Sequence, residues 1–118
     1  PRMSVTDCLF CSIASGEIPA DVVHESETLI AFRDISPQAP LHLLIVPKQH
    51  IASLDAARAP HQSLLGDMML LAADLARTES IAGHGYRIVI NTGVDGGQAV
   101  SHLHLHLLGG RQMEWPPG

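Results

Sequence analysis

The stretch Ser101-His102-Leu103-His104-Leu105-His106-Leu107-Leu108 places a histidine at every second position, with a leucine between each pair. Successive side chains of a β-strand point to opposite faces, so this spacing predicts a strand with three imidazoles on one face and leucines on the other. Gly96-Gly97 before the stretch and Gly109-Gly110 after it allow tight turns or close approach by a ligand. The histidine face is therefore the first candidate functional site.

Two kinds of chemistry fit a row of imidazoles. A His-x-His pair on a strand can hold zinc, with a third ligand from elsewhere and an open position for water. Alternatively, one histidine can attack a phosphorus atom while its neighbours contact the phosphate oxygens. A histidine face that merely lies in solvent is the third interpretation, and the regular alternation with leucine argues against it. The residues of the stretch alone leave the first two open.

The composition limits the class of protein and its partners. The chain has 118 residues, of which 46% are hydrophobic, which suits a single globular domain over residues 1–118 that ends in an extended tail over 111–118. A formal net charge of −5 argues against a nucleic-acid partner. The sequence shows neither a membrane span nor a signal segment, so a cytoplasmic protein without a membrane partner is expected. Pro1 and Arg2 precede Met3 and fit an added remnant, so no prediction rests on them.

The hydrophobic pattern predicts an antiparallel α+β domain with five strands and two helices. Strands are expected over residues 22–24, 28–33, 42–46, 86–91 and 101–108. A short helix is expected over 8–15, with Thr6 or Asp7 as its N-cap, and a long amphipathic helix over 60–82. Strands in local hairpins favour this class over a βαβ array.

The histidine stretch resembles the signature of the histidine triad (HIT) superfamily, His-φ-His-φ-His-φ-φ with φ apolar, and residues 102–108 fit at every position. The segment from Asn91-Thr92-Gly93 to the C-terminal Trp115-Pro116-Pro117-Gly118 is similar to its Hint branch, the nucleotide-binding nucleoside phosphoramidases. The resemblance implies a HIT-like fold, with a five-stranded antiparallel sheet, one long and one short helix, and two sheets joined across a homodimer. It also implies a purine nucleotide (AMP or GMP type) as substrate.

The same resemblance assigns the catalytic histidines. His104, the middle histidine of the triad, is the implied nucleophile, and it would form a nucleotidyl-histidine that water then opens. His106 and His42 are implied to lie beside the phosphate oxygens and the leaving group, where a donor stabilises developing charge or protonates the departing atom. For one imidazole nitrogen to attack, the other must carry the proton, so a backbone carbonyl is expected to hold it.

Further residues are implied to bind the nucleotide. Asn91 and the amides around Gly97 and Gln98 match phosphate contacts, and Asp34 matches the carboxylate that binds the ribose hydroxyls. An apolar slot for the base is implied for Leu9, Phe10, Ile13, Phe32, Ile35 and Leu44. Two other positions concern the leaving group, namely Ala99, where the branch commonly has a serine, and Trp115, whose tail is implied to complete the partner's pocket.

Cys8 and Cys11 form a C-x-x-C pair, which in a cytoplasmic protein suggests metal or redox chemistry. Several bacterial HIT proteins and the galactose-1-phosphate uridylyltransferases bind structural zinc with such a pair, the histidine of a Pro-x-x-His turn and the first triad histidine. By this resemblance the zinc ligands are Cys8, Cys11, His50 and His102. A closed Cys₂His₂ set would brace the short helix against the histidine stretch and leave the chemistry to His104.

The implied function is hydrolysis of purine nucleoside 5′-phosphoramidates or aminoacyl-adenylate-type substrates. A dinucleoside polyphosphate hydrolase is the rival enzyme, which the Trp-Pro-Pro-Gly tail disfavours. The alternative function outside enzymes is a nucleotide-binding adaptor with little turnover, and Ala99 counts somewhat in its favour. A zinc hydrolase that uses the triad as its metal site is disfavoured because the cysteines offer a better zinc site.

Overall fold

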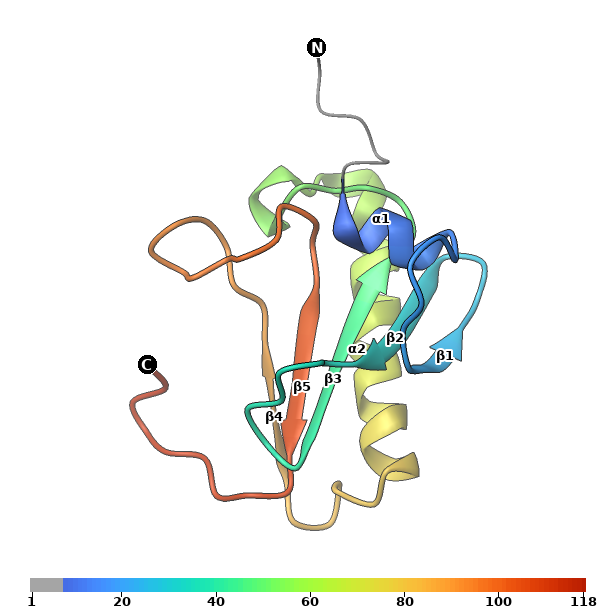
Figure 1. Ribbon diagram of the computed structural model, residues 1–118. Helices are drawn as coiled ribbons and strands as arrows, with labels where there is room; N and C mark the ends of the chain where they lie inside the picture. The colour runs from blue at the N-terminus through green and yellow to red at the C-terminus, as the bar shows by residue number, and fades with distance from the viewer. Residues whose placement is uncertain (1–7) are drawn as a thin grey trace.

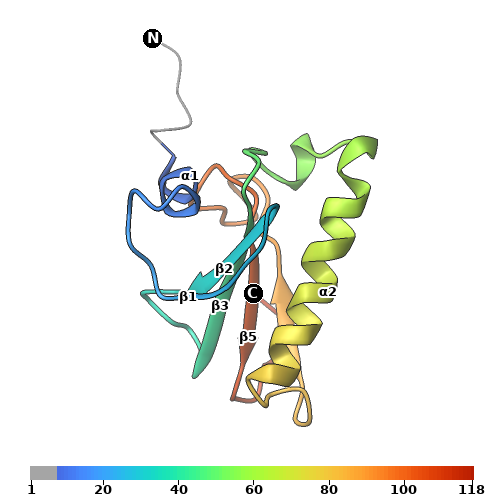
Figure 2. The same ribbon diagram turned by 90° about the vertical axis from the view of Figure 1, so that its right-hand side faces the viewer.

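The structure, a computed structural model that describes residues 8–118, is a five-stranded antiparallel sheet with a helix on each side (Figure 1). The strands, in the order β1-β2-β3-β5-β4, are β1 (Val22–Glu25), β2 (Leu29–Arg33), β3 (Leu41–Pro47), β5 (Leu105–Gly109) and β4 (Tyr86–Val89). The helices are α1 (Leu9–Ala14) and α2 (Gln62–Thr78), with short 3-10 turns at η2 (Leu54–Ala56) and η3 (Ala59–His61). Figure 2 shows α2 along one face of the sheet and α1 near one end of the other face. The predicted fold class is confirmed.

Alternating side chains of the central strand β3 divide the core into two layers. Ile45 faces α2 and belongs to the same cluster as Met68. Leu44 points the other way and belongs to the cluster that contains Phe10 of α1. All seven residues of β3 are buried, as expected of a strand with a neighbour on each side and a helix over each face.

The histidine stretch is paired as a strand over only its second half. β5 begins at Leu105, so residues 101–104 lie outside the sheet, contrary to the prediction of one strand over 101–108. The N–H of Leu103 instead donates to the carbonyl oxygen of Ile51 at 2.6 Å, which ties this half to the loop after β3. Residues 101 and 102 are bends, and residues 103 and 104 lead into β5 without pairing with a neighbouring strand.

The short helix α1 begins one residue after Cys8, whose Sγ accepts the N–H of Cys11 at 3.4 Å. Cys8 is therefore the N-cap, a place usually taken by an oxygen-bearing side chain. Thr6 and Asp7, the predicted caps, lie outside the described residues. The first metal-ligand candidate thus also fixes where the helix starts.

The long helix α2 ends at Thr78, four residues before the predicted end at Ala82. Ser80 adopts φ 64°, in the left-handed region, and the N–H of Ile81 donates to the carbonyl oxygen of Ala76 at 3.0 Å. This pattern closes a helix in the way that a C-terminal glycine usually does. Among residues 8–118, no helix is long and apolar enough to cross a membrane.

Candidate functional site

The three triad rings lie on the α1 side of the sheet. Phe10 of α1 packs edge-on against His104, with ring centroids 4.9 Å apart, and against His102 at 6.0 Å. The rings of His104 and His106 have centroids 5.0 Å apart. Leu103, Leu105 and Leu107 lie in the core that faces α2. The predicted division into a histidine face and a leucine face therefore holds, although only half of the stretch is a strand.

The tautomer of His104 is fixed by the main chain. Its Nδ1 lies 2.7 Å from the carbonyl oxygen of His102. A carbonyl oxygen can only accept, so Nδ1 carries the proton and Nε2 keeps the lone pair. The side chain is buried at 5% exposure. His104 thus has the carbonyl-held imidazole expected of a nucleophile.

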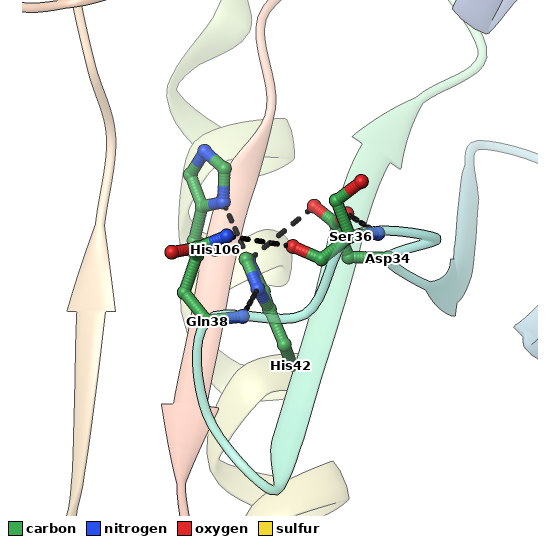
Figure 3. A network of polar contacts seen from close by, with 5 residues as sticks. All are labelled: Asp34, Ser36, Gln38, His42 and His106. Carbon is green, nitrogen blue, oxygen red and sulfur yellow. Dashed lines mark hydrogen bonds and ion pairs between the residues drawn. The ribbon is translucent and has the colours of Figure 1, made fainter.

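His42 and His106 form a second ordered pair, shown in Figure 3. The backbone N–H of Gln38 donates to Nδ1 of His42 at 3.0 Å, so His42 carries its proton on Nε2. That Nε2–H donates to Nδ1 of His106 at 2.9 Å, which leaves the proton of His106 on its own Nε2. Within residues 8–118, Nε2 of His106 is a buried nitrogen that lacks a hydrogen-bond partner. The pair therefore presents a buried N–H donor next to His104.

Asp34, directly after β2, lies against the same pair. Its Oδ2 is 3.5 Å from Nε2 of His42. Burial lowers the pKa of His42, and Asp34 opposes this effect. Burial, followed by the charges of His104 and His42, lowers the pKa of His106 to about 4, again against Asp34. Both imidazoles are therefore neutral near pH 7, and His106 acts as a hydrogen-bond donor without a positive charge.

An apolar cavity of about 270 Å³ opens on the α1 side of the sheet. All the residues predicted to form the base slot line it, namely Leu9, Phe10, Ile13, Phe32, Ile35 and Leu44, together with Asp34. Ile35 is 98% exposed and therefore lies at the rim, whereas Phe10 is buried and also contacts His104. Sequence reasoning missed five further lining residues, Ile18, Pro19, Ala20, Arg33 and Val100. Phe10 therefore lies between this cavity and His104, which does not itself line the cavity.

In the glycine-rich loop before the triad, the backbone N–H groups predicted to bind phosphate form hydrogen bonds within the loop itself. The N–H of Gly97 donates to the carbonyl oxygen of Val94 at 3.0 Å, and that of Gln98 to Gly93 at 3.1 Å. The side-chain amide of Gln98 donates to the carbonyl oxygen of Ala52 at 2.8 Å. These two backbone amides are therefore already engaged within the loop.

The other predicted nucleotide contacts lie in different surroundings. Asn91 is half-buried and follows β4 two residues after Val89, the strand partner of His106. Ala99 is exposed, and its methyl group offers no hydrogen bond. Trp115 is 81% exposed in the C-terminal tail and is not part of the cavity wall. Asn91 thus follows the strand that pairs with the triad strand, whereas Trp115 lies away from the cavity.

The four predicted metal ligands come together at the other end of the triad. The Sγ atoms of Cys8 and Cys11 and one ring nitrogen each of His50 and His102 lie within 4.8 Å of one another. Nδ1 of His102 is 3.2 Å from both Sγ of Cys8 and Nδ1 of His50. Tetrahedral ligands bound to zinc at ~2.0 Å through nitrogen and ~2.3 Å through sulfur lie ~3.3–3.8 Å apart, so the spacing suits zinc. Nε2 of His102 donates to the carbonyl oxygen of Pro47 at 2.7 Å, which directs the Nδ1 lone pair toward the group.

A second set of possible metal donors consists of Asp34, His42 and His106. A neutral imidazole has one lone pair, and that of His42 accepts the N–H of Gln38, so Nε2 has none for a metal. This set is therefore better described as a hydrogen-bond chain. The ring of His102 belongs to the group with the cysteines, and the ring of His106 belongs to the hydrogen-bonded set with His42 and Asp34. The three triad histidines therefore do not converge on a single metal ion.

Comparison with known proteins places this chain among close relatives. The model of the HIT domain family matches residues 15–113. An uncharacterized HIT-like protein of Synechococcus elongatus is 54% identical over 112 residues, which cover 95% of this chain and 97% of that protein. The crystal structure of a HIT family hydrolase from Legionella pneumophila has a TM-score of 0.93 and 56% identity, over 94% of this chain and 99% of that chain. A zinc-bound histidine triad family protein from Mycobacterium smegmatis has a TM-score of 0.77 and 30% identity, over 98% and 82% of the two chains.

Proposed function

Because this chain belongs to the HIT domain family, we propose that it is a hydrolase that cleaves purine nucleoside 5′-phosphoramidates or aminoacyl-adenylate-type substrates through a nucleotidyl-histidine intermediate. HIT family proteins bind nucleotides, and the similar Legionella protein is described as a hydrolase. The finer choice of substrate comes from the likeness of residues 91–118 to the phosphoramidase branch.

The opposite tautomers of His104 and His106 carry the proposal. His104 offers a lone pair at Nε2, because its Nδ1–H is held by the carbonyl of His102. His106 offers an N–H at Nε2, because its Nδ1 accepts from His42. A nucleophile and a buried donor on neighbouring rings suit attack on a phosphorus atom whose oxygens gain negative charge.

The reaction would proceed in two displacements. In the first, Nε2 of His104 bonds to phosphorus, the phosphorus–nitrogen bond to the leaving amine breaks, and the departing nitrogen takes up a proton from solvent that the second step returns. In the second, water attacks phosphorus and the bond to Nε2 breaks, which restores the lone pair of His104. Over both steps one water supplies a proton to the amine and a hydroxyl to the phosphate. Neutral His106 would donate to a phosphoryl oxygen throughout, since its low pKa makes it a weak proton acceptor.

The nucleotide would lie with its base in the apolar cavity and its ribose at Asp34. The carboxylate of Asp34 accepts the N–H of Ser36 at 2.8 Å and has further lone pairs for ribose hydroxyls. Since the amides of Gly97 and Gln98 are engaged in their loop, we assign the phosphate to the N–H of His106 and the side-chain amide of Asn91. The cavity offers apolar contacts to the base.

We also propose that Cys8, Cys11, His50 and His102 hold a structural zinc ion, in line with the zinc-bound relative from Mycobacterium smegmatis. Bound zinc would cross-link α1, the turn after β3 and the histidine stretch. The residues proposed to perform the chemistry, His104 with His106 and His42, are not among these ligands. The metal would thus act on catalysis only through the positions of the residues that it holds.

The experiment that tests this function is a rapid quench with adenosine 5′-phosphoramidate labelled at phosphorus. Label should appear on the wild-type protein before free AMP does, and peptide mapping should find it on His104. His104→Ala should abolish both label and turnover while AMP still binds, and His84→Ala, at an exposed turn, is the matched control. Equal turnover in the His104→Ala variant contradicts the nucleophile, and tight AMP binding without turnover of any substrate indicates an adaptor. Faster cleavage of dinucleoside polyphosphates favours the rival hydrolase.

A further inference from the structure

The loop between β2 and β3 is held at three points by one residue, Gln38. Its backbone N–H donates to Nδ1 of His42 at 3.0 Å, and its side-chain amide donates to the carbonyl oxygen of Ser36 at 2.9 Å. Its own carbonyl oxygen accepts Nε–H of Arg111 at 3.0 Å. Figure 3 shows Gln38 directly beside His42. A residue of the C-terminal tail is therefore bonded to the loop that orients His42.

The start of the tail also packs against this loop. Gly110 has φ 91°, and a Cβ atom at this position would lie 2.9 Å from Cβ of Pro40. Glycine is therefore required at 110, both for the backbone conformation and for the close approach to Pro40. This approach brings Arg111 within reach of Gln38. In the described part of the chain, the guanidinium of Arg111 donates to main-chain carbonyls, that of Gln38 and, at 3.3 Å, that of Gln112.

We propose that Gln38 and Arg111 are positioning residues that keep His42 neutral and in one tautomer, so that the C-terminal tail supports the catalytic histidines of its own subunit. The role in the reaction rests on the proposed hydrolase function. The N–H of Gln38 occupies the only lone pair of neutral His42, so a second proton cannot be added without displacing it. Arg111 holds the adjoining carbonyl, which keeps the N–H of Gln38 directed at the ring.

The charges around His42 make this restraint necessary. Asp34 lies 3.5 Å from its Nε2 and favours a protonated ring. His106 accepts from the same Nε2, and His104 lies beyond His106, with Phe10 of α1 as the apolar neighbour of His104. If Nδ1 of His42 were released, Asp34 would favour the imidazolium form, and the alternative neutral tautomer would accept a proton from His106. In the latter case Nε2 of His106 would become a lone pair facing a phosphoryl oxygen, and the donor would be lost.

The test is an NMR titration of ¹⁵N-histidine-labelled full-length protein without substrate. Gln38→Pro removes the N–H, and Gln38→Ala keeps it. Arg111→Met removes the donor to Gln38, and Arg111→Lys keeps one. We expect Gln38→Pro and Arg111→Met to raise the pKa of His42 by about one pH unit and to mix its tautomers, while Gln38→Ala and Arg111→Lys keep the wild-type signature.

A fifth variant separates this role from a general loosening of the tail. Arg87 donates to the carbonyl oxygen of Glu114 at 3.0 Å, so Arg87→Met loses a tail contact without touching the Gln38 loop, and its His42 signals should stay unchanged. With phosphoramidate substrates, Arg111→Met should lower kcat about ten-fold with little change in KM, which Arg111→Lys should largely restore.

Two outcomes overturn the proposal. One is a folded Gln38→Pro variant with the wild-type His42 pKa and tautomer. The other, which decides the matter if Gln38→Pro does not fold, is an Arg111→Met variant whose His42 titrates as in Arg111→Lys. Because the titration uses no substrate, a wild-type protein without hydrolase activity would contradict the proposed function separately from either result.

Discussion

Nδ1 of His102 lies 3.2 Å from Sγ of Cys8. The carbonyl oxygen of the same His102 lies 2.7 Å from Nδ1 of His104, so one residue joins the proposed zinc site to the proposed nucleophile. Helix α1 provides a second connection, because Phe10, which packs on His104, lies between Cys8 and Cys11 in the chain. The proposed metal site and the proposed nucleotide site are therefore connected through His102 and α1, although they share no ligating residue.

The first prediction concerns metal content. The purified protein should hold one zinc ion per chain, and a Cys8→Ala/Cys11→Ala double variant should hold none after dialysis. Cobalt substitution of the wild type should give the absorption of cobalt–thiolate bonds, which the double variant should lack. The melting temperature should fall in the double variant, because a structural metal contributes directly to folding. Stoichiometric zinc in the double variant would show that the ligands lie elsewhere.

A second prediction follows from the shared helix α1. Leu9 and Ile13 line the cavity, and the proposed metal ligands Cys8 and Cys11 lie at the N-cap and within the same short helix. Removal of zinc should therefore weaken AMP binding by about five-fold or more, and AMP should raise zinc affinity by the same factor, because coupling between two sites is reciprocal. Calorimetry of AMP binding with and without zinc, and chelator competition with and without AMP, measure the two factors. Equal AMP affinity in both metal states would rule the coupling out.

The two faces of the histidine stretch could be predicted because side-chain alternation is local and needs no knowledge of the partner strand. The start of the strand could not be predicted, since it depends on Leu103 bonding to Ile51 instead of to a neighbouring strand. The end of α2 was misplaced for a related reason. Ser80 adopts the left-handed conformation for which sequence reasoning expects a glycine.

In the site as well, the features that depend on side-chain identity could be predicted, and those that depend on main-chain geometry could not. The residues of the predicted base slot do line one cavity. They could be predicted because the resemblance depends on side-chain type and position in a motif. The role of Gln38 could not be found in this way, since its contact with His42 uses a backbone N–H that every residue except proline has. The engaged amides of Gly97 and Gln98 were likewise beyond a motif, because loop closure decides their partners.

A third prediction concerns stability at low pH. Burial first, then His104 and His42, lowers the pKa of His106 from 6.5 to about 4. Between pH 6.5 and about 4 the unfolded chain binds a proton at His106 that the folded chain does not bind. The contribution of neutral His106 to the free energy of unfolding is therefore fully present above pH 6.5 and is lost as the pH falls toward about 4. Since the ring is only partly buried, we expect about 1–2 kcal/mol after allowance for solvent screening.

Urea unfolding of the wild type and of His106→Gln at several pH values measures this contribution. The wild type should lose more stability than the variant across the window, and the two should run parallel above it. His42 and His102, whose pKa values burial also lowers, are present in both proteins, so the difference isolates His106. Parallel curves over the entire range would contradict the assigned pKa.

The last prediction concerns the end of the chain, for which we propose a role in a homodimer. Trp115 is 81% exposed, and β4 is an edge strand of the sheet, which leaves an apolar side chain and a row of backbone groups for a second copy of this chain. A two-fold interface would repeat the contact, so each tail would reach the other subunit's pocket.

Truncation after Gln112 keeps Arg111 bonded to Gln38 and removes Trp115. It should therefore change the ranking of amine leaving groups more than the ranking of bases and leave the His42 titration unchanged. Truncation after Gly110 should add the effects of Arg111→Met. Light scattering at assay concentration should give a dimer for the full chain, and a fully active monomer, or a truncation after Gln112 that preserves leaving-group preference, would contradict the role of the tail.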